Sequence, residues 1–287
     1  MIWLGTAGWS YLPDWVGPFY PPGTSSSDAL SRYVEAFPFV EIDSTFYAAP
    51  AVTTLQKWAK VMPPTFRVAP KAPKQLTQET GLRVPDIPFG HFCDSLYEHL
   101  GERIARIVVQ MPPSFARTTD NAWALRRFVE QWSARIPLAI ELRNMSWRTD
   151  GLQQFCREHQ VTLVGHDLHD YDLSRASYDT SDDAAYIRLI GQHDGIGKVR
   201  IVRPQTEARA WWVGQIADLI ARGVRTSTWS PTITTKAMRP KRSGRLPPSW
   251  PTPTYPWCRS RACPTVRWIC SVREHVEARA VSSICSP

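Results

Sequence analysis

Short apolar runs alternate with longer amphipathic stretches along the first 226 residues of the chain. The short runs are rich in Val, Ile, Leu and Phe, and they are bounded by turn-forming or charged residues, a pattern that predicts buried strands. The predicted strands cover residues 2–6, 39–43, 66–71, 104–110, 138–143, 161–166 and 185–190. The stretches between them have the spacing of amphipathic helices, which are predicted at residues 27–36, 53–61, 89–100, 121–135, 150–159 and 206–222.

The ends of these helices carry their own signals. Thr53 and Asp150 stand where helix N-caps belong, and Gly101 and Gly223 stand where helices stop. Strands that alternate with helices in this way favour a parallel sheet with helical crossovers. One further strand and helix after residue 226 would complete a (β/α)8 barrel, so the predicted fold class is α/β with a TIM-type barrel.

The residue usage changes near Thr226. Residues 227–287 contain ten Lys and Arg against two Glu, nine of the 25 prolines and four of the six cysteines. Because this segment has a net charge of +8, it accounts for the whole net charge of the chain, and residues 1–226 are balanced. We therefore expect a barrel domain over residues 1–226 and a disordered basic tail over residues 227–287.

A shift of reading frame is our explanation for this tail. When residues 232–240 are translated back into bases and read one nucleotide earlier, they permit the sequence Asn-Asn-His-Tyr-Glu-Gly-His-Ala-Pro. Residues 227–231 permit Val-Tyr-Val-Val-Ala, which has the composition of a strand. The sequence therefore predicts that the eighth strand and helix are missing from this translation. The first and seventh strands would then have open edges, and the product would be inactive.

The composition of residues 1–226 suits one domain in a reducing compartment. The chain has no apolar stretch long enough to span a membrane and no secretion signal at its start. Cys93 and Cys156 are too few for a disulfide framework, which favours the cytoplasm. The four cysteines of the tail match no zinc-ligand spacing. The sequence leaves the oligomeric state open.

Charged and polar residues recur where the predicted strands end. Parallel strands place their carboxyl ends on one face of a barrel, so these side chains are expected to meet there. They are Glu41 and Asp43, Lys71, Gln110, Glu141 and Arg143, His166 and Asp167, and Arg188.

Two interpretations of this cluster stay open. The carboxylates could simply neutralise the cations in a structural network. Alternatively, Glu41, Asp43 and Glu141 could perform acid/base chemistry, with Glu141 as the preferred general acid/base and Lys71 as a point charge or nucleophilic amine. Arg143 and Arg188 would then clamp an anionic substrate. Interleaved cations disfavour a metal, because a dication repels them.

Aromatic side chains crowd the loop after the first strand. Trp9 and its neighbours could stack on a sugar or a base, or they could pack the loop over the barrel. The balanced charge of residues 1–226 disfavours a nucleic-acid partner.

Several motifs resemble one family, in the same order along the chain. They are GTAGWSY at residues 5–11, EIDSTFY at 41–47, KAP at 71–73, QMPPSF at 110–115, ELR at 141–143 and YIRL at 186–189. Together they resemble the YecE-like family, also called domain of unknown function 72. The resemblance implies a TIM barrel of unassigned activity. The chain departs from the family at Asn144-Met145, where His-Pro is usual, and at Ile190, where His is frequent.

The function that we predict is an enzyme that acts on a small, polar, anionic substrate by acid/base chemistry, without a metal or another cofactor. The catalytic candidates are Glu141, Glu41, Asp43 and Lys71, and the substrate-binding candidates are Arg143, Arg188, Gln110, Asp167, Tyr47 and Trp9. Hydrolysis, isomerisation and lyase chemistry all fit this set. The alternative is a module that binds an anionic ligand or a nucleic-acid end without converting it.

Overall fold

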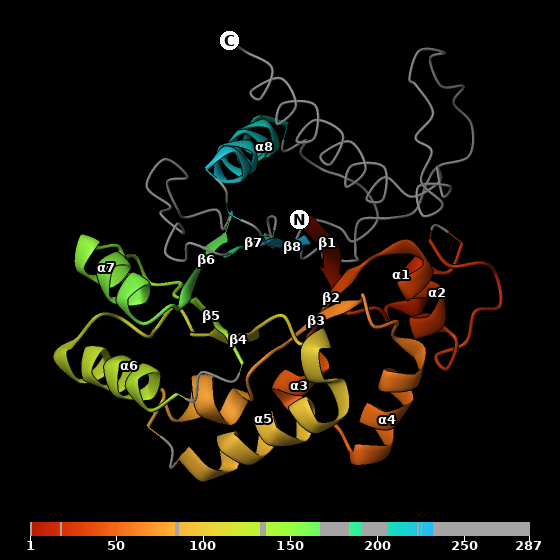
Figure 1. Cartoon of the computed structure of the whole chain (residues 1–287), viewed down its shortest axis with the longest axis horizontal. Coiled ribbons are helices and arrows are strands. Elements are labelled where there is room, and N and C mark those ends of the chain that lie inside the picture. The colour runs from red at the N-terminus through yellow and green to blue at the C-terminus, as the bar shows by residue number, and fades with distance from the viewer. Residues whose placement is uncertain are drawn as a thin grey trace.

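The structure is a computed structural model, and it describes residues 2–17, 19–83, 86–132, 136–166, 184–190, 206–222, 224 and 226–231. Eight parallel strands form one sheet with the order β3-β2-β1-β8-β7-β6-β5-β4 (Figure 1). The strands are β1 Ile2–Ala7, β2 Phe39–Ile42, β3 Arg67–Pro70, β4 Ile107–Gln110, β5 Leu138–Glu141, β6 Thr162–His166, β7 Ala184–Leu189 and β8 Thr226–Pro231.

The two outer strands of this order meet and close the sheet. Bridges join Val68 to Ile104 and Lys71 to Val108, and the backbone N–H of Ala105 donates to the carbonyl of Val68 at 2.8 Å. A sheet of eight parallel strands joined end to end is a barrel of the TIM type. The predicted fold class is therefore confirmed.

The eighth strand corrects one expectation from the sequence. Residues 226–231 form β8, which pairs with β1 from Ile2 opposite Ser227 and with β7 from Ala184 opposite Thr226. Backbone pairing depends on N–H and C=O groups that nearly every residue supplies. A segment of Thr, Ser and Trp can therefore pair with the edges of β1 and β7. The proline at position 231 is the last residue of the strand, so its missing N–H affects only the end of the ladder. The helix expected after β8 lies outside the described residues.

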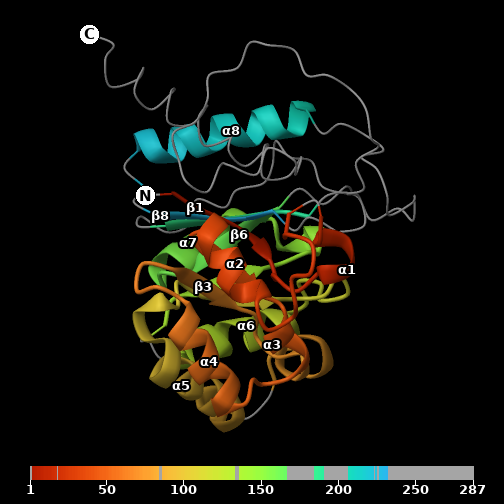
Figure 2. The ribbon, with the colours of Figure 1, turned by 90° about the vertical axis from the view of Figure 1, so that its right-hand side faces the viewer.

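The helices lie around the outside of the sheet, and α8 covers β7 and β8 in both ribbon views (Figures 1 and 2). The main helices are α2 Ala29–Ala36, α4 Val52–Val61, α5 Asp86–Leu100, α6 Thr119–Gln131, α7 Asp150–Glu158 and α8 Thr206–Ala221. Short elements that the sequence pattern did not predict are α1 Leu12–Trp15, α3 Ser44–Tyr47, a π-helical turn at Gln75–Glu79, and 3-10 turns at Gly101–Arg103 and Met145–Trp147.

The caps of the helices differ in part from the prediction. Ala51, not Thr53, occupies the N-cap position of α4, and Thr149, not Asp150, caps α7 by accepting a hydrogen bond from the N–H of Leu152. Asp150 instead lies in the first turn, where its charge favours the helix dipole. Gly101 follows α5 with a φ of 52°, as expected for a glycine that ends a helix. Gly223 lies outside the described residues.

The apolar core has an inner and an outer part. Within the barrel, one layer contains Phe39, Ala69, Val108, Ala139, Val164 and Tyr186. Alternate residues of the same strands, such as Val40 and Ile187, belong to the larger cluster between the sheet and the helices. Gly5 leaves room for Phe39, because a Cβ atom on it would lie 1.9 Å from the carbonyl oxygen of Phe39. The inner layer ends where the polar residues at the strand ends begin.

Candidate active site

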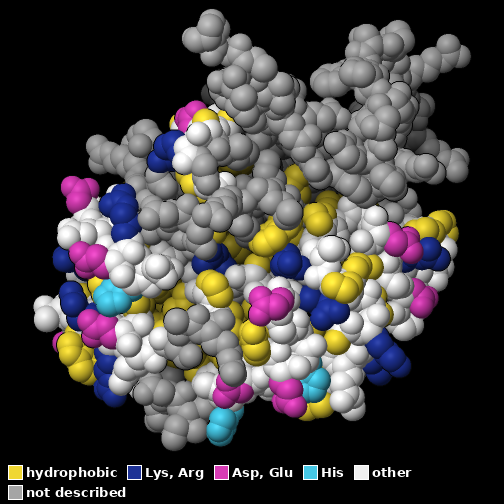
Figure 3. Space-filling model, viewed as in Figure 1, with side chains coloured by type: hydrophobic (Ala, Val, Ile, Leu, Met, Phe, Trp, Pro, Cys, Tyr) yellow, Lys and Arg dark blue, Asp and Glu magenta, His cyan; other side chains and the backbone are white. Residues whose placement is uncertain are grey.

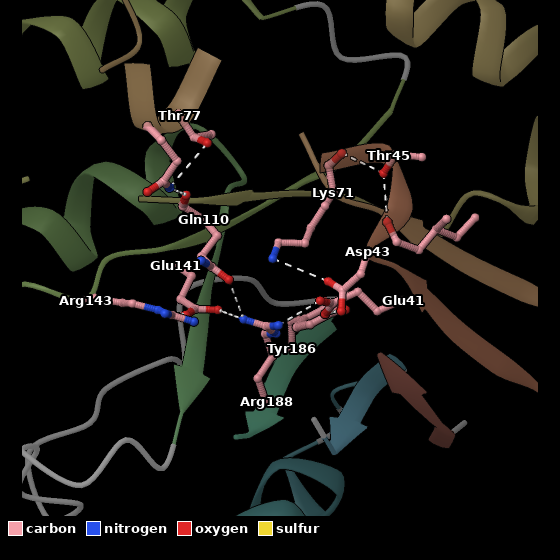
Figure 4. Close-up of polar contacts among 12 residues, drawn as sticks. Glu41, Asp43, Thr45, Lys71, Thr77, Gln110, Glu141, Arg143, Tyr186 and Arg188 are labelled. Carbon is pink, nitrogen blue, oxygen red and sulfur yellow. Dashed lines mark hydrogen bonds and ion pairs between the residues drawn. The ribbon is translucent and has the colours of Figure 1, made fainter. Parts of the chain in front are cut away.

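Two buried carboxylates and one arginine form the centre of the polar cluster at the carboxyl ends of the strands (Figure 4). Arg188 on β7 donates from Nη2 to Oε1 of Glu41 on β2 at 2.8 Å. From Nη1 it donates to Oε2 of Glu141 on β5 and, at 2.9 Å, to Oε1 of Gln110 on β4. Both carboxylates are completely buried and Arg188 is nearly so. The guanidinium therefore links β7 to three other strands across the barrel.

Glu41 has both oxygens occupied. The hydroxyl of Tyr186 donates to Oε2 at 2.8 Å, and Arg188 occupies Oε1. Burial raises the pKa of Glu41 above its usual range, and the negative charge of Asp43 raises it further. The positive charge of Arg188 lowers this pKa but does not outweigh burial. Tyr186 remains a neutral phenol, because burial and the neighbouring Glu41 raise its pKa well above the usual value.

Glu141 lies between two arginines. Its Oε2 accepts from Arg188, and its Oε1 accepts from Nε of Arg143. Burial alone would raise the pKa of Glu141, but the charges of Arg188 and Arg143 outweigh burial and hold the pKa well below its usual range. Arg188 thus lowers the pKa of both carboxyls, but burial outweighs its charge at Glu41, whereas Arg143 adds a second positive charge beside Glu141, so the two pKa values move in opposite directions.

Asp43 and Lys71 form a second, more accessible pair. Nζ of Lys71 lies 3.3 Å from Oδ1 of Asp43, and 4.6 Å from the centre of the Phe46 ring. The side chains are 11% exposed for Lys71 and 25% for Asp43, whereas those of Glu41 and Glu141 are not exposed at all. This pair is therefore the part of the acidic cluster that a ligand can contact.

The short helix α3 positions this pair. The strand β2 ends at Ile42, so Asp43 does not continue the alternation of the strand but precedes α3 with helical backbone angles. The hydroxyl of Thr45 donates to the carbonyls of Ile42 and Lys71, at 2.7 and 2.8 Å. These bonds tie the start of α3 to the ends of β2 and β3, and they bring Asp43 next to Lys71.

Arg143 also faces outward from the buried network. Its side chain is 20% exposed, and only its Nε atom is bonded within the described part of the chain, to Glu141. His166 lies at the end of β6. Burial and the charge of Arg143 lower its pKa, and the charge of Glu141, which raises it, does not outweigh them. The imidazole is therefore neutral at physiological pH.

The structure brings together most of the residues predicted from the sequence. Glu41, Glu141, Gln110, Arg143 and Arg188 form one network, with the Asp43–Lys71 pair beside it. Within the described residues, Trp9 and Tyr47 have no hydrogen bond or ion pair with this network.

Trp9 packs edge-on against Trp58 of α4, with the ring centres 5.3 Å apart. This contact fits the packing role that the sequence left open for it. Tyr47 is 79% exposed at the end of α3. Asp167 lies outside the described residues.

Two tyrosines of the site were not among the predicted residues. Tyr186 lies two residues before Arg188 on β7, and the period-two alternation of a strand could have placed both inside the barrel. Tyr11 occupies the N-cap position of α1, and burial and the charges of Asp43 and Glu41 raise its pKa to about 12. Its loop position gave no signal that its hydroxyl would lie near these carboxylates.

The described residues contain no group of three or more His, Cys, Asp or Glu side chains arranged to hold a metal ion. None of the helices within the described ranges is long and apolar enough to cross a membrane. On the face shown in Figure 3, basic and acidic side chains of the described residues are interspersed without a continuous basic stripe.

Comparison with known proteins identifies the family. The sequence pattern of the family described as "Protein of unknown function DUF72" matches residues 3–237. The chain belongs to this family. The match continues past residue 226, where the composition of the chain changes.

Relatives and solved structures agree with this DUF72 assignment. The chain is 34% identical over 152 residues to UPF0759 protein YunF of Bacillus subtilis, and 24% identical over 181 residues to UPF0759 protein YecE of Escherichia coli K12. These matches cover 51% and 63% of this chain, and they span 52% and 60% of the relatives' length.

The fold is similar to that of two solved DUF72 proteins. The TM-score is 0.68 for TM1631 of Thermotoga maritima, at 23% identity, and 0.62 for EF0366 of Enterococcus faecalis, at 21% identity. Each comparison covers 83% of this chain, and 94% and 93% of the solved chains.

Proposed function

We propose that this DUF72 protein is an enzyme that performs acid/base chemistry on a small, polar, anionic substrate at the carboxyl ends of the barrel strands. One observation carries the proposal: the charged residues separate into a buried, hydrogen-bonded layer and a partly exposed set. The buried layer contains Glu41, Glu141 and Arg188, and the partly exposed set contains Asp43, Lys71 and Arg143.

The buried layer is a framework in this proposal. Glu41 and Glu141 each have both oxygens occupied, and both terminal nitrogens of Arg188 bond carboxylates. A carboxylate between two arginines is a weak base, and its acid form is not populated near neutral pH. We therefore move two roles predicted from the sequence. Asp43 replaces Glu141 as the general acid/base, and Arg143 replaces Arg188 as the group that binds the substrate anion.

The exposed set can carry out a proton transfer. Asp43 would accept a proton from the substrate and return it to the product, and its neighbour Lys71 would stabilise the negative charge that develops. Arg143, which is held in place by Glu141 through Nε, would present its terminal nitrogens to a carboxylate or phosphate. The buried layer fixes Arg143, and the bonds of Thr45 at the start of α3 fix Asp43 beside Lys71, so little rearrangement is needed during the reaction.

A ligand screen followed by turnover assays tests this proposal. The wild-type chain is screened by thermal shift against phosphorylated and carboxylated small molecules, and every compound that binds is tested for conversion. We expect Asp43→Asn to lower kcat by about 10²- to 10⁴-fold and to keep the ligand-induced thermal shift. Arg143→Ala should raise KM before it lowers kcat.

Glu79→Gln is the matched control, because Glu79 is an exposed carboxylate that pairs with Lys74 at 3.2 Å, away from the cluster. It should leave kcat and KM unchanged. A compound that binds the wild type and is never converted would refute the proposal, and it would identify the protein as a binding module. Full activity of Asp43→Asn would refute the role of Asp43.

We also propose a cytoplasmic location. Cys93 and Cys156 are both free and buried, as expected for a protein in a reducing compartment. The interspersed charges on the face in Figure 3 give no support to a nucleic-acid partner.

A further inference from the structure

We propose that Lys71 is a covalent catalyst, which forms an imine with the carbonyl group of a substrate that also carries a carboxylate or phosphate. This inference rests on the proposed function and deepens it, because it names the reacting group of the substrate and the atom of the protein that it joins.

The backbone of Lys71 is held firmly at the end of β3. Its N–H donates to the carbonyl of Ile42 at 3.2 Å, and its carbonyl accepts from the hydroxyl of Thr45 at 2.8 Å. The next N–H, that of Ala72, donates to the carbonyl of Val108 at 2.9 Å. A nucleophile must meet its target within a narrow range of positions, and a fixed backbone with an 11% exposed side chain meets this need.

The surroundings of the Lys71 nitrogen suit an iminium ion as well as they suit an ammonium ion. Both ions carry one positive charge on the same nitrogen, so the carboxylate of Asp43 at 3.3 Å and the Phe46 ring at 4.6 Å stabilise either one. The cluster has three carboxylates and three cations, and its formal charge is therefore zero before and after imine formation. Imine formation at Nζ therefore leaves the charge balance of the protein groups unchanged.

The reaction balances with the groups present. Nζ of Lys71 passes one proton to Asp43, and its lone pair then bonds the carbonyl carbon. A second proton moves from the nitrogen to the former carbonyl oxygen, which gives a carbinolamine. Asp43 returns the first proton to this hydroxyl group, the C–O bond breaks, and water leaves. The products are the iminium ion, one water molecule and the Asp43 carboxylate.

Arg143 restricts the substrate class. It lies on the other side of the cluster from Lys71 in Figure 4, and its terminal nitrogens have no partner among the described residues. A guanidinium with free terminal nitrogens binds carboxylate or phosphate in a bidentate manner. Keto acids and phosphorylated aldehydes or ketones combine such an anion with a carbonyl carbon.

Reductive trapping tests the proposal. The full chain is incubated separately with pyruvate, glyoxylate and glyceraldehyde 3-phosphate, each with sodium borohydride, which reduces an imine to a stable amine. We expect one adduct, located at Lys71 by peptide mass spectrometry, with at least one of the three probes. Lys71→Arg keeps the positive charge beside Asp43 but cannot form the adduct, and it should abolish the label.

Lys74 is the internal control. It lies three residues away and is 54% exposed, so nonspecific labelling of surface amines would mark it more strongly than Lys71. Arg143→Ala should reduce trapping of the anionic probes and leave trapping of acetaldehyde unchanged. Labelling of Lys74 at or above the level of Lys71, or no Lys71 adduct with any probe, would overturn the imine.

The two proposals fail separately. If Asp43→Asn abolishes turnover of a substrate and no probe is trapped at Lys71, the acid/base function stands and the imine is wrong. If Lys71 is trapped and Asp43→Asn retains full turnover, the imine stands and the role of Asp43 as the acid/base group is wrong.

Discussion

Replacement of Arg188 by Met should be among the most destabilising single changes in the described part of this chain. Arg188 is 2% exposed and donates to two carboxylates that have no exposure, and also to Gln110. Methionine has a similar unbranched stem but no charge, so the change removes the shared counter-ion without leaving a large void. Glu41 and Glu141 would then be buried with less compensation.

The bonds of Arg188 set the size of the effect. A hydrogen bond to a charged group contributes about 1.5–3 kcal/mol, and Arg188 makes one to each of two carboxylates, which gives about 3–6 kcal/mol. Removing one partner of a buried ion pair costs about 3–5 kcal/mol in other proteins, in agreement with this range. Because a domain is stable by only about 5–15 kcal/mol, we expect Arg188→Met to remove about a fifth of the stability or more.

The loss should depend on pH. Without Arg188 the pKa values of both buried carboxyls would rise in the folded state, above the unfolded value of about 4.3. A carboxyl with a raised folded pKa loses stability as the pH rises through the range between its unfolded and folded values. The deficit of the variant should therefore be smaller at about pH 5 than at about pH 8.

Urea unfolding of both proteins at the two pH values measures the effect. Lys74→Met is the control, because its ion pair with Glu79 is exposed on both sides and is expected to contribute about 1 kcal/mol or less. The reasoning is refuted if Arg188→Met costs no more than this control, or if its deficit grows as the pH falls.

Three further predictions concern the barrel, the thiols and the reading frame. Gly5→Ala places a Cβ atom 1.9 Å from the backbone oxygen of Phe39, and it should lower the free energy of unfolding in urea by about 3 kcal/mol. The control Gly90→Ala meets nothing within 4 Å, and it should leave this free energy unchanged or raise it by up to about 1 kcal/mol. Equal effects of the two changes would contradict the prediction. Cys93 and Cys156 should resist iodoacetamide in the native protein and react in urea, because both are buried and burial raises the pKa of each thiol to about 12. Peptide mass spectrometry measures the labelling of each thiol. Fast labelling of the native protein would refute the prediction. Sequencing of the DNA that encodes residues 226–240 should reveal an alternative frame that reads Asn-Asn-His-Tyr-Glu-Gly-His-Ala-Pro; if no frame does, the predicted shift is wrong.

The strand ends show how far the candidate site could be predicted. Glu41, Glu141 and Arg188 each stand in a strand, where the alternation of side chains and the common direction of parallel strands place them inside one end of the barrel. The same alternation places Tyr186, two residues before Arg188 on β7, inside the barrel as well. The positions of Tyr11 and Asp43 cannot be derived in this way, because a loop and a short helix set them and neither has a fixed period.

The alternation of strands and helices can be derived from the chain's own residues, and with it the barrel and the end at which charged residues gather. These properties depend on local periodicity, which each segment carries in its own residues. The closed barrel is needed to show that Arg188 bonds Glu41 and Glu141, that Glu141 lies between two arginines, and that Asp43 remains accessible beside Lys71. The distances between side chains on opposite strands, and the burial of these side chains, arise only when the eight strands close into a barrel. They cannot be derived from the residues of any single strand. The eighth strand also depends on the tertiary structure. The edges of β1 and β7 pair with a segment whose composition alone did not predict a strand.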